Sequence, residues 1–435
     1  MKETRASFAL LIFIIIAHIA HLLPQSSSTS IVTQSYPATA CPAGVSGAQA
    51  TALLASKNIE IRNINQPSVE LKKNGSGSYP LSRGAILVAG NAANTNVIMT
   101  RSGKWSSAAT CTISPSINWF VGGTANVTSQ SKLILINSGL SDALIDLTAY
   151  SESGASQSLP VTVKASSEKV VRIDSLSPGS ERIVLKVETR SGRVTSYLLD
   201  ERVRGLSNIG ADFVPATSEA SRELVIAGLN VKLGSSSSIK HTLRLMSVGE
   251  VDASASVEII SPDGVYVPVG FGEISLNARE VTDIDLSGVD FGSKAFALKI
   301  SATEEIVASV LSEVKSGSVS DFTWSAPSQS FNSVTFNIYG LEPVISFVGE
   351  RVILSIVWRD RQGKSNSELI RGDEIVNWRV PPNTRLLTIS SASPVVAAMS
   401  WISGDGVARL GIAPSTNLES ATKPVADIAV IQPRG

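Results

Sequence analysis

The sequence predicts an all-β protein made of tandem immunoglobulin-like β-sandwich modules after an N-terminal transmembrane or signal helix. Three observations support this prediction. Short runs of alternating apolar and polar residues recur along the chain, as in "RVILSIVW" (residues 351–358), and turn residues separate them. A pattern of such runs repeats with a period of roughly 110 residues, which is typical of sandwich domains. Finally, the first 25 residues are apolar behind a basic start.

Composition limits the classes of protein that need to be considered. The chain has 435 residues, enough for several domains, and 43% of them are apolar. Lys+Arg and Asp+Glu are both 37, so the formal net charge is zero. Nucleic-acid binding requires a basic footprint that neutralises phosphates, and this balance argues against it.

Residues 1–25 are expected to be a signal anchor or a signal peptide. "MKETR" is followed by an uncharged apolar run over residues 6–23, and eighteen helical residues span about 27 Å, close to the thickness of a bilayer core. No clean Ala-x-Ala cleavage site follows. We therefore expect a single-pass membrane protein with an extracytoplasmic C-terminal region, or a secreted protein if the segment is cleaved.

Residues 31–117 are expected to form a small β-module closed by a disulfide. Short strand-like runs alternate with turn signals, and one possible helix lies at residues 46–58. The two cysteines of the chain, Cys41 and Cys111, most simply form one disulfide in an exported protein, closing a loop that the chain-entropy model assigns roughly 4 kcal/mol. The alternative is a pair of unpaired buried thiols.

Three β-sandwich repeats are predicted after this module, at residues 118–206, 220–316 and 320–435. The order of elements in the first recurs in the second: Asn137 corresponds to Ser247, and Asp174 to Asp285. The third segment follows the pattern more loosely.

The residues of known catalytic chemistry form no recognisable motif. His18 and His21 lie in the apolar run, which leaves His241 alone, and we expect it to be a surface residue at a strand edge. Asp283 and Asp285 stand about 6.6 Å apart on one strand face, and an outward face explains them better than a glycosidase pair. We therefore predict no catalytic residues, no cofactor and no metal site.

Tryptophan is the residue most able to bind sugars by stacking. Three tryptophans share the apolar face of their strands and are expected in the core of the last sandwich: Trp358, Trp378 and Trp401. Three others lie near loops or strand starts and are the candidates for stacking on a ligand: Trp105, Trp119 and Trp324.

Several motifs together resemble a family of exported actinobacterial proteins catalogued only as a domain of unknown function. They are "ATACPAG", "AATCTISPSINWFVGG", "SKLILINSGLSDALIDLTAY" and "VVRIDSLSPG". The resemblance implies an N-terminal membrane segment and a location in the envelope of a Gram-positive-type cell, with no established catalytic residues. A strand follows the double glycine of "WFVGG", whereas a phosphate cradle would need a helix there. We therefore interpret Trp119, Gly122 and Gly123 as the entrance to the first sandwich, next to the disulfide-closed module.

The expected function is that of a non-enzymatic cell-envelope protein on the outer face of the cytoplasmic membrane, acting as an interaction or structural module. Its partners would be the membrane, through residues 6–23, and cell-wall glycan or another envelope protein. A carbohydrate-binding or carbohydrate-active envelope protein is the first alternative, and an adhesin is the second.

Overall fold

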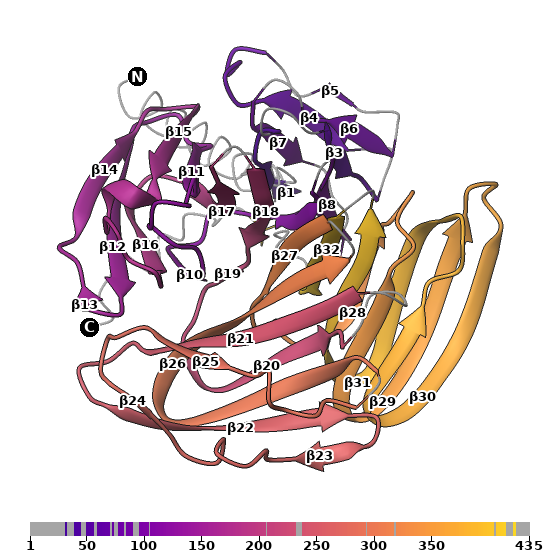
Figure 1. Cartoon of the computed structure of the whole chain (residues 1–435). Helices are drawn as coiled ribbons and strands as arrows, with labels where there is room; N and C mark the ends of the chain where they lie inside the picture. Colours follow the sequence, from indigo (N-terminus) through magenta and orange to yellow (C-terminus); the bar gives the residue numbers. More distant parts are fainter. Residues whose placement is uncertain are drawn as a thin grey trace, which may run out of the picture. The chain divides into compact units, whose positions relative to one another are not determined.

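Strands account for nearly all of the regular structure in the computed structural model (Figure 1). It describes residues 31–32, 39–44, 49–55, 59–69, 72–73, 77–81, 84–89, 95–103, 105–205, 207–231, 237–292, 294–316, 319–403, 406–414 and 421–422. The predicted all-β class is confirmed. The predicted anchor at residues 1–25, with His18 and His21, lies outside the described residues. Within them, no helix is long and apolar enough to cross a membrane.

The chain divides into two units, of which one comprises residues 36–417. In the other, β1 (Ile31–Val32) pairs antiparallel with β33 (Ala421–Thr422).

The N-terminal segment contributes strands to two sheets. They are β2 (Thr39–Cys41), β3 (Gln49–Leu53), β4 (Glu60–Asn63), β5 (Lys72–Lys73), β6 (Ser78–Pro80), β7 (Ile86–Ala89), β8 (Thr95–Ser102) and β9 (Ser107–Cys111). One sheet has the order β2-β7-β4-β5, and the other contains β6, β3, β8 and β9. The predicted disulfide is confirmed: Cys41 on β2 is bonded to Cys111 on β9, which links the two sheets.

The prediction of a possible helix at residues 46–58 is wrong for the part that the structure describes, residues 49–55. Residues 49–53 form β3, which lies between β6 and β8. Ala50 and Ala52 point into the core and are buried, so the alanines that suggest a helix act instead as small side chains of a strand.

The first repeat also has two sheets. Its elements are β10 (Ile117–Val121), β11 (Lys132–Asn137), β12 (Ala143–Ser151), β13 (Gly154–Ala155), β14 (Leu159–Val163), β15 (Ser167–Arg172), the 3-10 turn η1 (Ile173–Ser175), β16 (Val184–Ser191), β17 (Val194–Arg204), β18 (Ser207–Val214) and β19 (Ala216–Thr217). One sheet has the order β13-β12-β16-β10-β19, with β14 also on β12, and the other has the order β15-β11-β17-β18. Leu133 and Leu135 from the second sheet share one core with Ile145 and Leu147 from the first.

The second repeat keeps this strand order. Its strands are β20 (Ser221–Leu229), β21 (Ser237–Ser247), β22 (Ala253–Ser261), β23 (Gly264–Tyr266), β24 (Ile274–Leu276), β25 (Thr282–Asp285), β26 (Phe296–Ser316) and β27 (Val319–Ser325). The first part of β26 pairs with β20 and β22, as β16 pairs with β10 and β12. Its last part pairs with β21 and β27, as β17 pairs with β11 and β18. One long strand therefore replaces two.

The corresponding residues Asn137 and Ser247 also make corresponding contacts. Both are fully buried, and each donates to the carbonyl oxygen four residues later: Asn137 Nδ2 to Ser141 at 2.8 Å, and Ser247 Oγ to Val251 at 3.2 Å. The matched contact gives the residue correspondence a structural basis.

The third segment is built differently from the first two. Its strands are β28 (Phe331–Asn337), β29 (Val344–Asp360), β30 (Ser365–Arg379), β31 (Thr384–Ser403) and β32 (Gly406–Ile412). Three of them, β29, β30 and β31, are long and pair along most of their length (Figure 1). The order is β30-β29-β31-β28, and parallel pairing of β28 with β8 joins this segment to the N-terminal one in a nine-stranded sheet.

The last strand of each segment closes a hairpin, and these four strands pack on one another. They are β9, β18, β27 and β32. Contacts run from β9 to β18, from β18 to β27, from β27 to β32, and from β32 back to β9. The expected repeat boundaries leave β18 outside the first repeat, which ends at 206, and divide β27, because the third begins at 320.

Candidate functional site

Three carboxylates are buried where the four closing strands meet. Asp200 lies on β17, Asp212 on β18 and Asp321 on β27, and these residues are 0%, 1% and 5% exposed. A buried ionisable group is costly unless it is hydrogen-bonded or paired, so the contacts of these carboxylates define what the centre does.

The Asp321 carboxylate joins all four closing strands. On its own strand it accepts a hydrogen bond from the Phe322 N–H at 2.9 Å. From β32 it accepts the Val407 N–H at 3.0 Å. Backbone N–H groups of Ser106, immediately before β9, and of Ala211 on β18 lower the pKa of Asp321, so they face its carboxylate as well.

Two glycines make room for this carboxylate. A Cβ atom at Gly210 on β18 would lie 2.7 Å from Asp321 Oδ1, and a Cβ atom at Gly406 on β32 would lie 2.7 Å from Oδ2. Both distances are too short for a real contact. Gly210 also has φ +156°, in the region that favours glycine. The neighbouring backbones can approach the carboxylate because these residues lack side chains.

Asp212 makes the equivalent contact one strand earlier. Its Oδ2 accepts the Trp324 N–H of β27 at 2.8 Å. The two aspartates occupy matching positions in "ADF" (residues 211–213) and "SDF" (residues 320–322). In each case an Asp of one closing strand binds the backbone of the next, so the carboxylates act as cross-links between modules.

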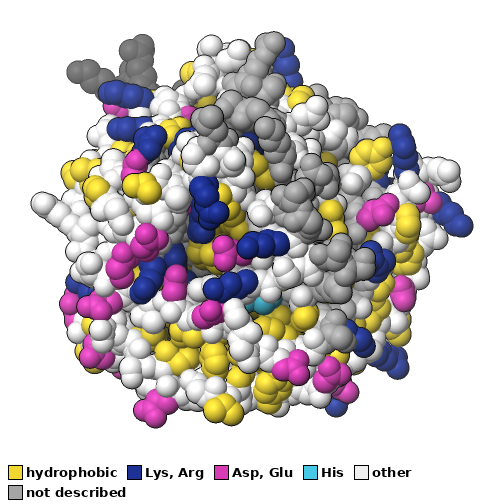
Figure 2. Space-filling model, viewed as in Figure 1, with side chains coloured by type: hydrophobic (Ala, Val, Ile, Leu, Met, Phe, Trp, Pro, Cys, Tyr) yellow, Lys and Arg dark blue, Asp and Glu magenta, His cyan; other side chains and the backbone are white. Residues whose placement is uncertain are grey.

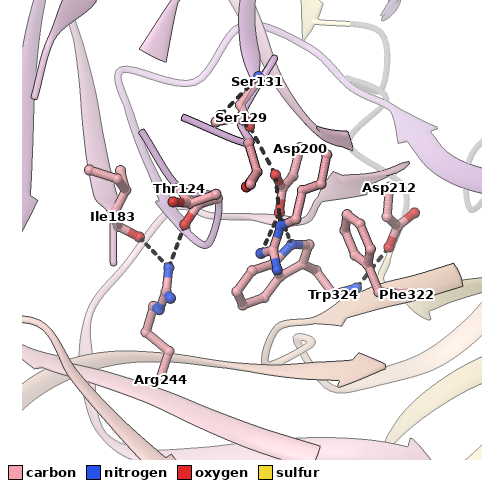
Figure 3. A network of polar contacts seen from close by, with 12 residues as sticks. Thr124, Ser129, Ser131, Ile183, Asp200, Asp212, Arg244, Phe322 and Trp324 are labelled. Carbon is pink, nitrogen blue, oxygen red and sulfur yellow. Dashed lines mark hydrogen bonds and ion pairs between the residues drawn. The ribbon is translucent and has the colours of Figure 1, made fainter. Parts of the chain in front are cut away.

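Asp200 binds the side chain of Trp324 and extends the network (Figure 3). Its Oδ2 accepts the indole N–H at 2.8 Å and pairs with Arg202 Nη2 at 2.8 Å, and its Oδ1 accepts Ser131 Oγ at 2.9 Å. Trp324 belongs to the second repeat, yet its ring is buried in the core of the first.

Arg244 joins the two repeats at the double glycine. Its guanidinium is 5.2 Å from the Trp324 ring centroid, pairs with Asp283 at 2.7 Å, and donates to the carbonyl oxygens of Gly123 and Ile183. A Cβ atom at Gly122 would lie 3.0 Å from the Trp324 ring. The glycines therefore allow close contact between the first and second repeats, whereas the prediction from sequence places them at the junction of the disulfide-closed module with the first sandwich.

Burial dominates the electrostatics of the centre. It raises the pKa of Asp212 well above its usual range and the pKa of Asp321 to about 7, although the backbone hydrogen bonds act in the opposite direction. Burial also lowers the pKa of Arg409 on β32 to about 9, while the charge of Asp212 raises it. Asp212 Oδ1 and Arg409 Nε are buried without a hydrogen-bond partner among the described residues.

The prediction that His241 lies on the surface is wrong. The residue is 3% exposed, because β21 lies between β25 and β26 rather than at an edge. Nδ1 lies 2.9 Å from Ser312 Oγ, Nε2 lies 3.1 Å from the Asn230 carbonyl oxygen, and the ring meets Phe296 edge-on. Burial lowers its pKa to about 4, so the imidazole is neutral at pH 7.

The centre has little room for a substrate. The cavity beside His241 and Arg409 has a volume of about 10 Å³, enough for one water molecule. The geometry of this region supports packing and strand cross-linking rather than chemistry on a bound molecule.

The three tryptophans considered for stacking are not on the surface. The exposed fractions are 5% for Trp105, 7% for Trp119 and 1% for Trp324, so no open ring face remains for a sugar. The expectation that these residues could stack on a ligand is therefore wrong. Arg101 covers the ring of Trp105, and Tyr150 packs on Trp119 with ring centroids 5.7 Å apart. Trp378 and Trp401 are buried in one core cluster, as expected, whereas Trp358 is half-buried and packs against that cluster.

The two strand aspartates differ in their surroundings. Asp285 is exposed and pairs with Lys240 at 3.2 Å, in agreement with an outward face. Asp283 is half-buried because it pairs with the buried Arg244.

An open pocket lies at one end of the second repeat and has a volume of about 620 Å³. It is formed by β23, the loop after it, and the loop between β25 and β26. Its walls combine aromatic, aliphatic and acidic side chains, among them Tyr266, Phe271, Val289, Asp263 and Asp290. Figure 2 shows hydrophobic side chains gathered over this repeat.

Sequence reasoning missed both the carboxylate centre and the pocket. The signal for the centre is the repeated Asp-Phe, with 321 − 212 = 109 residues between the two aspartates, close to the repeat period. The signal for the pocket is "GVYVPVGFG" (residues 264–272), which places an unusual number of apolar residues in a turn-rich segment.

Comparison with known proteins identifies the family. The profile described as "Family of unknown function (DUF5719)" matches residues 84–337, more than half of the chain. The chain belongs to this family, and the expected membership of a family of unknown function is confirmed.

The other comparisons add little. A solved structure described as "Crystal structure of tetra-tandem repeat in extending region of large adhesion protein" is similar at 10% identity, over 87% of this chain and 94% of that one, with a TM-score of 0.12. So low a TM-score supports no argument. No curated protein matches.

Proposed function

We propose that this chain is a non-enzymatic cell-envelope protein, held at the outer face of the cytoplasmic membrane through residues 6–23, whose tandem β-sandwich modules form a structural and interaction unit. The observation that carries the proposal is the use of the buried carboxylates. Asp321 and Asp212 bind backbone N–H groups of neighbouring closing strands, so they hold modules together.

The placement of acid–base groups supports a non-enzymatic role. A general acid or base must come within hydrogen-bond reach of the substrate proton that it transfers. Asp321, with a pKa of about 7, has the value best suited to such transfer among the groups described above, and His241 carries the side chain most often used for it, yet both are buried and already hydrogen-bonded to the protein. The cavity next to His241 holds no more than one water molecule.

The disulfide supports an extracytoplasmic location. Cys41 and Cys111 are bonded, and structural disulfides persist in oxidising compartments and are rare in the cytosol. The apolar run at residues 6–23 provides the means of export or anchoring.

Carbohydrate binding is the second candidate, and the open pocket favours it. The pocket volume of about 620 Å³ falls within the usual range of small-ligand sites, and its walls mix aromatic and acidic side chains. Cell-wall glycan would be the partner in this case, and another envelope protein would be the partner if the surface around the pocket binds protein.

The test is retention of the full-length protein by envelope material. The protein is incubated with separated cell-wall glycan and envelope-protein fractions, with heat-unfolded protein as the control. We expect saturable retention by at least one fraction, without release of glycan or peptide fragments. Fragment release that disappears in His241→Gln or Asp290→Asn would overturn the non-enzymatic assignment, and equal retention of the unfolded control would overturn the interaction role.

A further inference from the structure

We propose that the open pocket of the second repeat binds a short glycan segment, with Tyr266 and Phe271 facing the sugar rings and Asp263 and Asp290 accepting hydrogen bonds from sugar hydroxyls. The inference rests on the proposed interaction role and names its ligand class. The residues proposed to contact the sugar therefore differ from the tryptophans that the sequence analysis considered for stacking.

The pocket has the size and the walls that a few sugar units require. Its volume of about 620 Å³ would hold two to three sugar rings, by comparison with roughly 300–1,000 Å³ for ligand sites in general. Tyr266 and Phe271 offer aromatic surface, and Pro268, Val269 and Val289 offer aliphatic surface. Sugar rings present C–H groups on their faces, which pack on such surfaces.

The acidic side chains supply hydrogen-bond acceptors. An ionised carboxylate has two oxygens and no donor, so it matches pairs of sugar hydroxyls. Neither Asp263 nor Asp290 belongs to an ion pair in the part of the chain that the structure describes. Asp285 differs, because it is held by Ser287 at 2.9 Å and by Lys240. Two carboxylates of the pocket therefore keep acceptor capacity for a ligand.

Contacts between the two loops form the pocket before a ligand binds. The Tyr266 hydroxyl donates to the Asp290 carbonyl oxygen, which ties β23 to the loop before β26. Asp290 Oδ1 accepts the Gly292 N–H at 3.0 Å. Gly292 has φ +74°, and a Cβ atom there would lie 2.7 Å from Asp263 Oδ2. The loops are thus fixed by specific contacts, which lowers the entropy cost of binding.

The rim of the pocket is unusually apolar for a surface loop. Of the residues that line the pocket, Tyr266 is 39% exposed and Val269 is fully exposed, and their chain neighbours Val265 and Val267 are each 46% exposed. Apolar side chains gathered in this way beside polar groups mark binding surfaces in soluble proteins. An apolar rim with acidic acceptors behind it suits an amphipathic polyol.

The experiment measures binding of defined probes to the full-length protein by isothermal titration calorimetry. The probes are β-1,4-linked tetramers of glucose, N-acetylglucosamine and glucosamine, together with tetralysine. We expect saturable binding of a neutral tetrasaccharide. Tyr266→Ala and Val269→Asp should each weaken it at least tenfold. Val269 is fully exposed, so its replacement should leave folding intact.

Tyr339→Ala is the matched control, because Tyr339 is also 39% exposed and lies outside the pocket. Unchanged affinity in this variant supports the proposal. Absence of tetrasaccharide binding at millimolar concentration, or binding that the pocket variants do not weaken, would overturn it. Binding of glucosamine and tetralysine alone would also overturn it, by assigning the pocket to cations. If envelope retention persists in both pocket variants, the glycan inference fails while the interaction role stands.

Discussion

Two groups of three aspartates place the same chemistry in opposite surroundings. Asp200, Asp212 and Asp321 are buried where the closing strands meet, and their oxygens bind protein donors. The second group lies in the open pocket of the second repeat and is exposed to solvent: Asp263, Asp285 and Asp290. The difference lies in the donors that each group faces, since each carboxylate of the first group accepts a backbone or indole N–H from another segment.

This contrast separates architecture from binding. A buried carboxylate that cross-links strands cannot be removed without leaving N–H groups unpaired, which is costly. An exposed carboxylate can be removed with little effect on folding. We therefore expect changes in the centre to alter stability and changes in the pocket to alter binding.

The largest expected effect is that of Asp321→Ala. It removes the acceptor for the N–H groups of Phe322 and Val407 and the negative charge that Ser106 and Ala211 face, and we expect the free energy of unfolding to fall by about 3–5 kcal/mol. Guanidinium unfolding measures the loss. Asp263→Ala is the control and should change stability by less than about 0.5 kcal/mol. Equal losses in the two variants would erase the contrast.

Trp324→Phe is expected to have the next largest effect. The variant loses the indole N–H bond to Asp200 and some buried volume, with an expected cost of about 2–3 kcal/mol. Trp401→Phe provides the control for volume alone, because Trp401 is buried in an apolar cluster. The cost at Trp324 should exceed the control by about 1 kcal/mol or more. If Trp401→Phe costs as much, the bond to Asp200 contributes nothing measurable.

The pH dependence of stability should distinguish Asp321 from a neutral replacement. Burial raises its pKa to about 7 in the folded protein, compared with an ordinary value of 3.8. The stability that this proton provides is fully present below pH 3.8 and is lost as the pH rises through 7. We expect the free energy of unfolding of Asp321→Asn, relative to wild type, to rise by more than about 1 kcal/mol between pH 5 and pH 8.

His241→Gln is the control for the pH experiment, because the contribution of His241 to the free energy of unfolding changes with pH in the opposite direction. Burial lowers the pKa of His241 from 6.5 to about 4, so its contribution is present above pH 6.5 and is lost as the pH falls through 4. Removing it should leave the difference between Asp321→Asn and wild type intact. A difference that stays constant from pH 5 to pH 8 would contradict the raised pKa.

The smallest stability effect is expected at the pocket rim. Val269→Asp should change the free energy of unfolding by less than about 0.5 kcal/mol, since Val269 is fully exposed. Thermal unfolding checks this, with Val352→Asp as the contrast because Val352 is fully buried. A loss above about 1 kcal/mol at Val269 would mean that the rim is structural.

Local patterns predict much of this fold, whereas its long-range contacts leave weaker signals. Alternation in runs such as residues 351–358 predicts strands, and the spacing of Asn137 and Ser247 reflects a shared strand order. The parallel pairing of β28 with β8 could not be predicted from local patterns, because it joins residues about 240 positions apart in sequence and depends on tertiary packing.

The errors at individual residues have a common physical cause. Trp105 and Trp324 stand among small polar residues that resemble loops, yet burial by neighbouring modules decides their exposure. His241 begins an apolar run as an edge residue would, but its strand is flanked on both sides. Asp321 interrupts the apolar alternation of its strand, because an inward carboxylate departs from the pattern that defines a core, so only the repeated Asp-Phe marks its position.

The central claim is that one carboxylate holds the closing strands of all four segments. Hydrogen–deuterium exchange at the backbone N–H groups of Ser106, Ala211 and Val407 tests it most directly, in wild type and in Asp321→Ala, which removes both acceptor oxygens. These groups lie on different segments: Val407 donates to the Asp321 carboxylate, and Ser106 and Ala211 lower its pKa. We predict that all three exchange at least tenfold faster in the variant. Faster exchange at only one of them, or at none, would contradict the account.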